Sequence, residues 1–100
     1  SLGCVSKAFL RDMIREERKL RLVYRDGEEV ETRRVVRPIA LIYHVDCVML
    51  AAWCELRSGF RHFRCDRIWV CEPLEERFEG RSAALREVWA ETNSFAPTEG

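Results

Sequence analysis

The residues best suited to chemistry lie in the stretch 54–68, where four arginines and a histidine are interleaved with apolar residues. The arginines are Arg57, Arg61, Arg64 and Arg67, and only two acids accompany them. Guanidinium groups stay charged at all relevant pH values and fork onto phosphate or carboxylate oxygens. A strand whose apolar residues face a core would hold these arginines in a row. The stretch therefore predicts a surface that binds anions.

The expected strand over 60–70 alternates between two faces, with Phe63 turned inward and Arg64 outward. Arg61 and Arg67 share the parity of Phe63. These two arginines must therefore leave the core at the ends of the strand or across a bulge.

The candidate site is expected at one rim of the sheet, because the turn Ser58-Gly59 brings Arg57 opposite Arg61 and His62. Arg64 lies further along, and Tyr43 and His44 are available for stacking or hydrogen bonding. The predicted ligand-binding residues are Tyr43, His44, Arg57, Arg61, His62, Arg64 and Arg67.

An alternative interpretation gives the arginines a structural role. Arg64 and Arg67 would then pair with Asp66, Glu55 or the acidic C-terminal segment and hold the fold together. Arg67, beside Asp66, is the arginine that fits this role best.

The elements that must position these residues are short strands between two helices. Ser6 can cap a helix over 6–18, and its apolar stripe is Val5, Phe9, Leu10, Met13 and Ile14. Alternating patterns and turn signals predict strands over 20–25, 28–37, 39–43, 47–56 and 60–70. Pro38 is expected to break the ladder and Pro73 to end the sheet.

A second helix is predicted over 82–92, with Leu85, Val88 and Trp89 as apolar positions, and 93–100 is expected to be a frayed tail. The fold class is mainly β with flanking helices. We expect a small five-stranded antiparallel barrel over 20–71 in a single domain over 1–92.

The charge distribution leaves two interpretations open. Basic and acidic residues both number 17, and a neutral chain normally argues against a nucleic-acid partner. The charges are segregated, however: 18–37 holds seven basic residues against four acids, and 72–91 holds six acids against three arginines. The segregation either creates a surface with two faces or only solvates the domain.

Metal binding, catalysis and membrane insertion find little support in the sequence. The five cysteines form no C-x-x-C pair and no zinc-ligand spacing, so we expect no metal and no cofactor. His44 and His62 lack a nucleophile motif, and no paired carboxylates are visible, so no enzymatic activity is expected. Free cysteines and the lack of a signal peptide or an apolar span predict a cytoplasmic protein.

Two motifs in the arginine stretch resemble a known family. The pattern C-x-x-R at 54–57, followed by R-x-F-R-x-D-R-I at 61–68, is similar to the C-terminal half of WYL domains. These are bacterial ligand-sensing modules usually attached to transcription regulators. The resemblance covers about 14–70: 21–27 resembles the first strand and turn, and 34–38 matches an R-x-V-x-P element. The Trp-Tyr-Leu triplet that names the family falls on Val48-Met49-Leu50.

The resemblance implies a barrel of the SH3 or Sm type and a bacterial transcriptional regulator with a helix-turn-helix DNA-binding domain N-terminal to Ser1. It also implies that the basic strand binds an anionic ligand such as single-stranded nucleic acid or a nucleotide. A second hypothesis is an interaction module. There the arginines are structural, and Leu85, Val88 and Trp89 form a weak homodimer or dock on another protein.

Overall fold

The computed structural model describes residues 6–78, 80–92 and 99–100. Its elements are α1 (Lys7–Glu16), β1 (Arg18–Arg25), β2 (Glu31–Tyr43), β3 (Val48–Cys54), β4 (Gly59–Arg64), the 3-10 helix η1 (Cys65–Arg67), β5 (Ile68–Arg77) and α2 (Ser82–Thr92). The five strands form one antiparallel sheet in the order β4-β3-β2-β1-β5.

Helix α1 begins as predicted, because the Ser6 hydroxyl accepts a hydrogen bond from the Phe9 amide at 3.0 Å. Leu10 and Met13 of the predicted stripe are buried, whereas Val5 lies outside the described residues. The helix ends at Glu16, earlier than expected, because Glu17 adopts a left-handed conformation with φ 54°. This single residue turns the chain directly into β1.

The ladder is irregular at Pro38, as predicted, but the prediction that this proline separates two strands is wrong. Strand β2 is continuous over 13 residues, and Pro38 is buried at an irregularity in its pairing with β3. The register there shifts between Pro38 and Ala40, so the missing proline amide falls where the ladder is already interrupted. The two strands predicted on either side of Pro38 are one strand, which pairs with β1 in its first half and β3 in its second.

The prediction of one strand over 60–70 is also wrong. A 3-10 turn at Cys65–Arg67 divides this segment into β4 and β5, which pair with different neighbours. Pro73 does not end the sheet either, because β5 continues to Arg77 beside β1. A proline is tolerated there since β5 is an edge strand and one side of its backbone needs no ladder partner.

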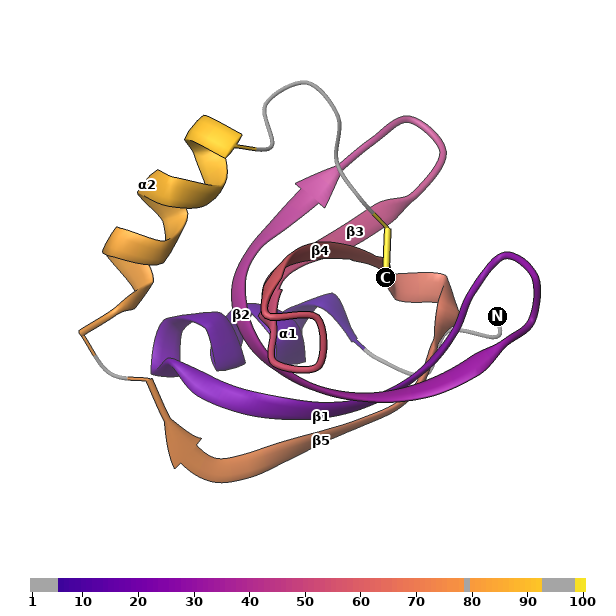
Figure 1. Ribbon diagram of the computed structural model, residues 1–100, viewed down its shortest axis with the longest axis horizontal. Helices are drawn as coiled ribbons and strands as arrows, with labels where there is room; N and C mark the ends of the chain where they lie inside the picture. Colours follow the sequence, from indigo (N-terminus) through magenta and orange to yellow (C-terminus); the bar gives the residue numbers. More distant parts are fainter. Residues whose placement is uncertain (1–5, 79, 93–98) are drawn as a thin grey trace.

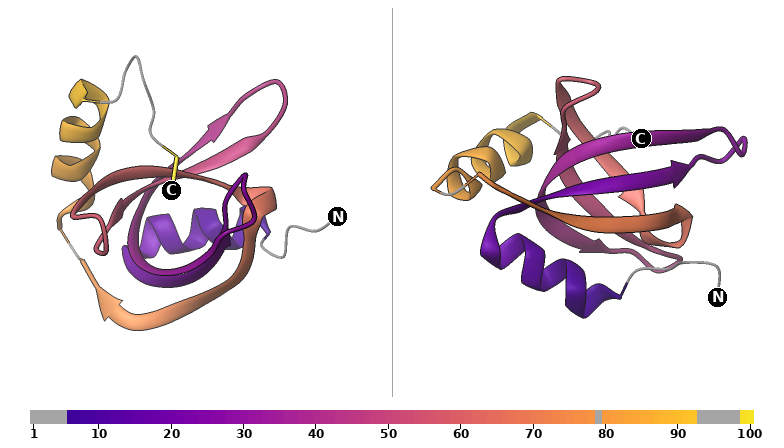
Figure 2. Two further views of the ribbon diagram at one scale, coloured as in Figure 1. Left: turned by 45° about the vertical axis from the view of Figure 1, so that its right-hand side comes forward. Right: turned by 90° about the horizontal axis from the view of Figure 1, so that it is seen from below.

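The sheet is strongly curved around the core, with α1 across one end and α2 at the side (Figures 1 and 2). Among the described residues no ladder joins β4 to β5, so the expected closed barrel is not confirmed. The mainly β architecture with five antiparallel strands and two helices is confirmed.

The core is built from the inward positions of the strands. Leu20, Leu22 and Tyr24 of β1 are fully buried, and the Tyr24 ring packs edge to face on Phe63 with centroids 5.0 Å apart. Helix α2 is held to the rest of the domain by the Glu17 carboxylate, which accepts hydrogen bonds from the amides of Gly80 and Ser82 at 3.0 Å each. Neither helix in the described part of the chain is long and apolar enough to cross a membrane.

Candidate anion-binding site

Two of the predicted arginines lie on either side of Gly59: Arg57 is in the turn between β3 and β4, and Arg61 is on β4 opposite Ala52. Arg57 is exposed, and Arg61 is half-buried with its Nη1 donating to the Phe60 carbonyl at 2.7 Å. Both flank Gly59, where an added Cβ would lie 3.3 Å from Arg61 Nη1 and 3.8 Å from the Arg57 carbonyl oxygen. Neither arginine forms an ion pair within the described residues. Their charges are therefore available to a ligand.

The other two predicted arginines are paired with acids. Arg64 donates to both carboxylate oxygens of Asp66 at 3.0 and 2.7 Å, and these hydrogen bonds lower the pKa of Asp66. Arg67 leaves the core at the 3-10 turn and donates to Glu99 at 2.5 Å. These contacts are the ones expected from structural arginines, and for Arg67 the partner comes from the end of the described chain.

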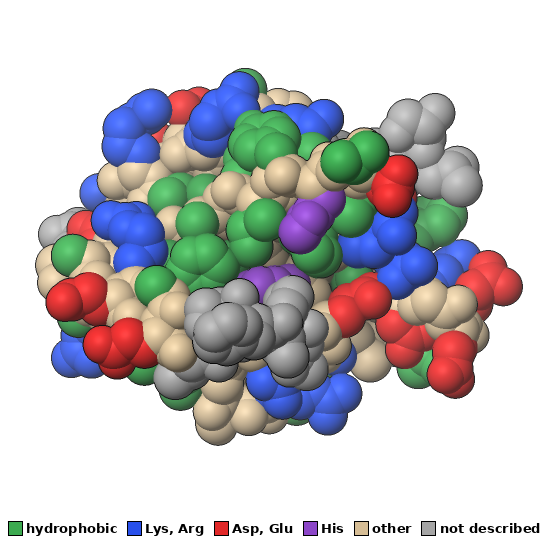
Figure 3. All heavy atoms as spheres, turned by 90° about the horizontal axis from the view of Figure 1, so that it is seen from above, with side chains coloured by type: hydrophobic (Ala, Val, Ile, Leu, Met, Phe, Trp, Pro, Cys, Tyr) green, Lys and Arg blue, Asp and Glu red, His purple; other side chains and the backbone are tan. Residues whose placement is uncertain are grey.

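His62 lies beneath α2 instead of at the rim. The His62 side chain is buried, and its Nε2 accepts a hydrogen bond from Trp89 Nε1 at 2.7 Å. Burial and the nearby His44 lower the pKa of His62. His44 is exposed in the turn after β2, and the exposed Tyr43 hydroxyl accepts from Arg11 at 2.6 Å. When the molecule is seen from above, hydrophobic side chains gather around the two histidines, and Lys and Arg side chains lie about them (Figure 3).

The structure adds a fifth arginine that the predicted set did not contain. Arg34 is only 4% exposed, yet it forms no ion pair with an Asp or Glu side chain among the described residues. Its guanidinium donates to the Thr32 hydroxyl at 3.1 Å, the Cys54 sulfur at 3.5 Å and the Gly100 backbone oxygen at 2.6 Å. Buried arginines are normally paired with acidic side chains, so this arrangement is unusual.

Arg34 borders a pocket of about 370 Å³ between the β1–β2 loop and the end of the described chain. Arg57 and Tyr24 also line this pocket. The Arg67 guanidinium lies beside Gly27, which lines the pocket: a Cβ added to Gly27 would lie 3.4 Å from Arg67 Nη1. Remaining lining residues are Asp26, Gly27, Glu28, Val30, Thr32, Glu99 and Gly100.

The β1–β2 loop is shaped by Asp26, whose Oδ1 accepts from the amides of Glu28 and Val30 at 2.8 and 2.9 Å. The predicted tight turn at Asp26-Gly27 is therefore a wider loop in which Glu29 has φ 62°. This loop forms one wall of the pocket.

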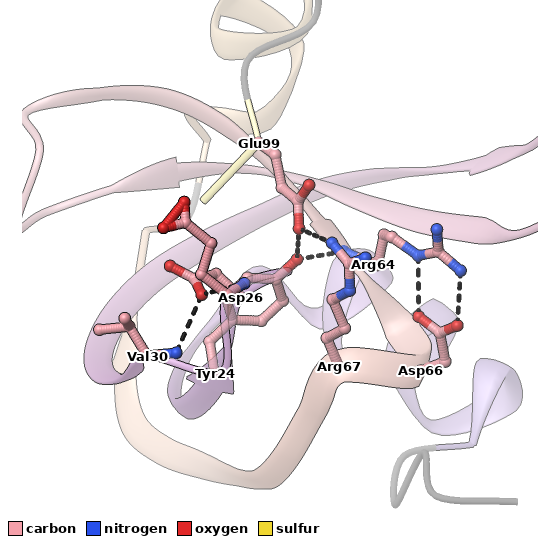
Figure 4. A network of polar contacts seen from close by, with 8 residues as sticks. Tyr24, Asp26, Val30, Arg64, Asp66, Arg67 and Glu99 are labelled. Carbon is pink, nitrogen blue, oxygen red and sulfur yellow. Dashed lines mark hydrogen bonds and ion pairs between the residues drawn. The ribbon is translucent and has the colours of Figure 1, made fainter.

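A carboxylate occupies one end of the pocket in this structure (Figure 4). Glu99 Oε2 accepts from the Tyr24 hydroxyl at 2.6 Å and from Arg67 Nη1 at 2.5 Å. The same hydroxyl accepts from the Arg64 amide at 3.0 Å. Burial opposes ionisation of Glu99, but the hydrogen bonds from Tyr24 and Arg67 and the charges of the neighbouring arginines outweigh it and lower the pKa of Glu99. The pocket therefore stabilises an oxygen anion.

The signal that could have found Arg34 and Tyr24 is the alternation of their strands. Tyr24 shares its parity with Leu20 and Leu22, and Arg34 shares its parity with Val36. An arginine on the inward face of a strand is conspicuous.

The cysteines behave as apolar core residues in the described part of the chain. Cys54 and Cys65 are buried, and burial raises the pKa of the Cys65 thiol to about 11 and that of Cys71 to about 12. Within the described residues, no group of His, Cys, Asp and Glu side chains could hold a metal ion.

The curved antiparallel sheet and the pocket lined by Arg34, Arg57 and three acids define a small β domain that combines arginines from β2 and from the β3–β4 turn. The sequence profile of the WYL domain matches residues 8–73, and the chain therefore belongs to the WYL domain family. A comparison with curated proteins gave no match.

A solved structure of proteasome accessory factor B/C (PafBC) of Arthrobacter aurescens is similar to this chain with a TM-score of 0.68 and 29% sequence identity over 92% of the chain. The match covers 13% of that PafBC chain, so the present domain spans only a small part of its length.

Proposed function

We propose that this WYL domain is the ligand-sensing part of a cytoplasmic bacterial transcriptional regulator and has no catalytic activity of its own. It binds an anionic ligand, either single-stranded nucleic acid or a nucleotide. The regulator would also contain a helix-turn-helix DNA-binding domain, whose conformation changes when the ligand binds. Membership of the WYL family and the similarity to PafBC support the regulatory part of the proposal.

The observation that carries the ligand class is the state of Arg34. A guanidinium that is 4% exposed, faces a pocket and has no Asp or Glu side-chain partner among the described residues favours an anion nearby. Arg57 lines the same pocket and forms no ion pair with another described residue, and Arg61 adds a positive charge on β4. A phosphate placed in the pocket would contact arginines that come from β2 and from the β3–β4 turn.

The proposal is tested by measuring the binding of a labelled oligothymidylate and of mononucleotides by fluorescence anisotropy at increasing salt. Arg57→Ala and Arg61→Ala should each weaken binding, and each lost phosphate contact should reduce the salt slope by about 0.7. Both variants should melt at the wild-type temperature, because arginines without ion pairs contribute little to stability.

Arg21→Ala is the matched control, since Arg21 is exposed on β1 and does not line the pocket. Equal weakening by all three variants would indicate nonspecific attraction and argue against a site. If Arg57→Ala and Arg61→Ala lower the melting temperature by several degrees and leave ligand binding unchanged, the arginines are structural.

A further inference from the structure

We propose that the Glu99 carboxylate occupies the anion position of this pocket in the ligand-free domain, and that the ligand binds by displacing it. The inference rests on the proposed function and adds a mechanism of competition within the chain. Glu99 would thereby set the ligand concentration at which the domain responds.

The first argument is the convergence of donors. Tyr24 and Arg67 donate to the same oxygen of Glu99, and Arg34 donates to the carbonyl of the adjacent Gly100. Two successive residues thus supply acceptors to donors from β1, β2 and η1. A carboxylate or phosphate with several oxygens can offer the same acceptors from one group.

The second argument is that Tyr24 requires an acceptor. The Tyr24 side chain is fully buried, and its O–H would lose its hydrogen bond if Glu99 left without replacement. A buried donor without a partner costs about 1–3 kcal/mol. An oxygen of the incoming ligand can take the place of Glu99 Oε2, so exchange conserves the bond, whereas simple release does not.

The third argument is that the displaced segment is held by few other contacts. Besides the bonds from these three donors, Glu99 and Gly100 are joined to the other described residues by a short parallel bridge, in which the Gly100 amide donates to the His62 carbonyl at 3.0 Å. The Glu99 side chain is 39% exposed, so a ligand can approach it from solvent. An anion of higher charge can therefore compete with it.

The test compares the affinity of the wild type with that of Glu99→Gln for the labelled oligothymidylate. Glutamine keeps an acceptor of similar shape but removes the charge that competes with the ligand. The matched control is Glu87→Gln, which removes the same charge from an exposed position on α2. We expect Glu99→Gln to bind about tenfold more tightly than the wild type. This factor corresponds to a wild-type pocket that is free of Glu99 in about a tenth of the molecules. Glu87→Gln should bind like the wild type.

A second measurement uses the wild type alone, so that the proposal does not depend on the folding of a variant. Inorganic phosphate, acetate and the oligothymidylate are each titrated while the Gly100 amide resonance is followed by NMR. Displacement should shift this resonance and speed its exchange with solvent. If phosphate shifts the Gly100 amide resonance at a lower concentration than acetate does, the anion position prefers phosphate groups. If acetate does so at the lower concentration, the position prefers carboxylates.

Three results would overturn the proposal in distinguishable ways. If Glu99→Gln and the wild type bind equally, Glu99 does not compete, and the proposed function stands alone. If binding leaves the Gly100 amide unchanged, the ligand lies elsewhere on the domain. If no variant binds any of the probes, both the proposed function and the competition fail.

Discussion

At the scale of single residues, the Tyr24 hydroxyl links the core to the pocket. It donates to Glu99 and accepts from the Arg64 amide, and its ring packs on Phe63 in the core. Both capacities of a fully buried hydroxyl are thus used. Burial, followed by the hydrogen bond to Glu99, raises the pKa of Tyr24 well above its usual value, so the group remains a donor at every physiological pH.

Tyr24→Phe should destabilise the domain by about 1–3 kcal/mol, because it removes the acceptor of the Arg64 amide and one of the two donors to the Glu99 carboxylate. Urea denaturation measures the loss. Tyr43→Phe is the control, since Tyr43 is 58% exposed and its hydroxyl contacts only the exposed Arg11 among described residues. The control should stay within about 0.5 kcal/mol of the wild type. Equal midpoints for the two variants would contradict this role of Tyr24.

His62 should make stability depend on pH. Burial lowers the pKa of His62 in the folded state. Below about pH 6.5, His62 therefore binds a proton more readily in the unfolded chain than in the folded domain. Stability should therefore be complete above that pH and should fall as the pH drops toward the lowered value. Protonation would also remove the lone pair that accepts from Trp89.

The measurement is the urea midpoint at about pH 7.5 and 5.5 for the wild type and His62→Gln. The wild type should lose more stability on acidification than the variant does. An identical loss in both proteins would show that other groups carry the pH dependence.

At the scale of elements, the sequence predicts what is local and misses what depends on partners. The cap at Ser6 and the second helix over 82–92 are confirmed, because the start of the first helix and the apolar spacing of the second are visible in neighbouring residues. Pro38 misled the prediction, since a proline signals a break only if the ladder needs its amide. Whether it does depends on the register between β2 and β3, which no local pattern reveals.

The same reasoning explains how much of the site was predictable. The predicted position of Arg57 opposite Arg61 across a two-residue turn is wrong, because the turn spans residues 55–58 and Arg61 pairs with Ala52. The pairing of Arg67 with Glu99 joins residues that are 32 positions apart in the sequence, and it depends on the tertiary position of Glu99. Local patterns therefore identified the exposed arginines, but the assembly of the pocket required the tertiary structure.

Helix α2 depends on a cap supplied from a distant element. Hydrogen bonds from the amides of Gly80 and Ser82 lower the pKa of Glu17, so its carboxylate is ionised at the positive end of the helix. Glu17→Ala should speed hydrogen exchange of the α2 amides and leave the β1–β2 ladder protected. Glu16→Ala is the control, because Glu16 is adjacent and makes no such bonds. Unchanged exchange in α2 would contradict the capping role.

At the scale of the whole molecule, the two oppositely charged segments lie beside each other. Strand β5 carries the start of the acidic segment and pairs with the basic β1. Lys19 forms ion pairs with Glu55 at 2.8 Å and with Glu76 at 3.4 Å, and the hydrogen bond that it donates to Glu55 is the main cause of its raised pKa. Part of the segregated charge is therefore neutralised within the fold. The weak homodimer stays a prediction, while Trp89 contacts His62 of its own chain.

The buried thiols should report on global unfolding. With the pKa raised to about 11 for Cys65 and about 12 for Cys71, almost no thiolate exists at neutral pH. Cys47, half-buried in the turn after β2, should react with iodoacetamide first, and Cys54 only at the rate of unfolding. Mass spectrometry of each cysteine during a urea titration tests this. Modification of Cys54 as fast as Cys47 in native buffer would contradict a tightly packed core.

The cap at Glu17 also has a consequence for the order of folding. Its two bonds join residues 63 and 65 positions apart, so they close a loop that contains the entire sheet. Closing such a loop early would cost more chain entropy than two hydrogen bonds return. The strands must first bring the ends of that loop together. Helix α2 should therefore be the last element to gain lasting structure during folding, and the first to lose it when the domain opens.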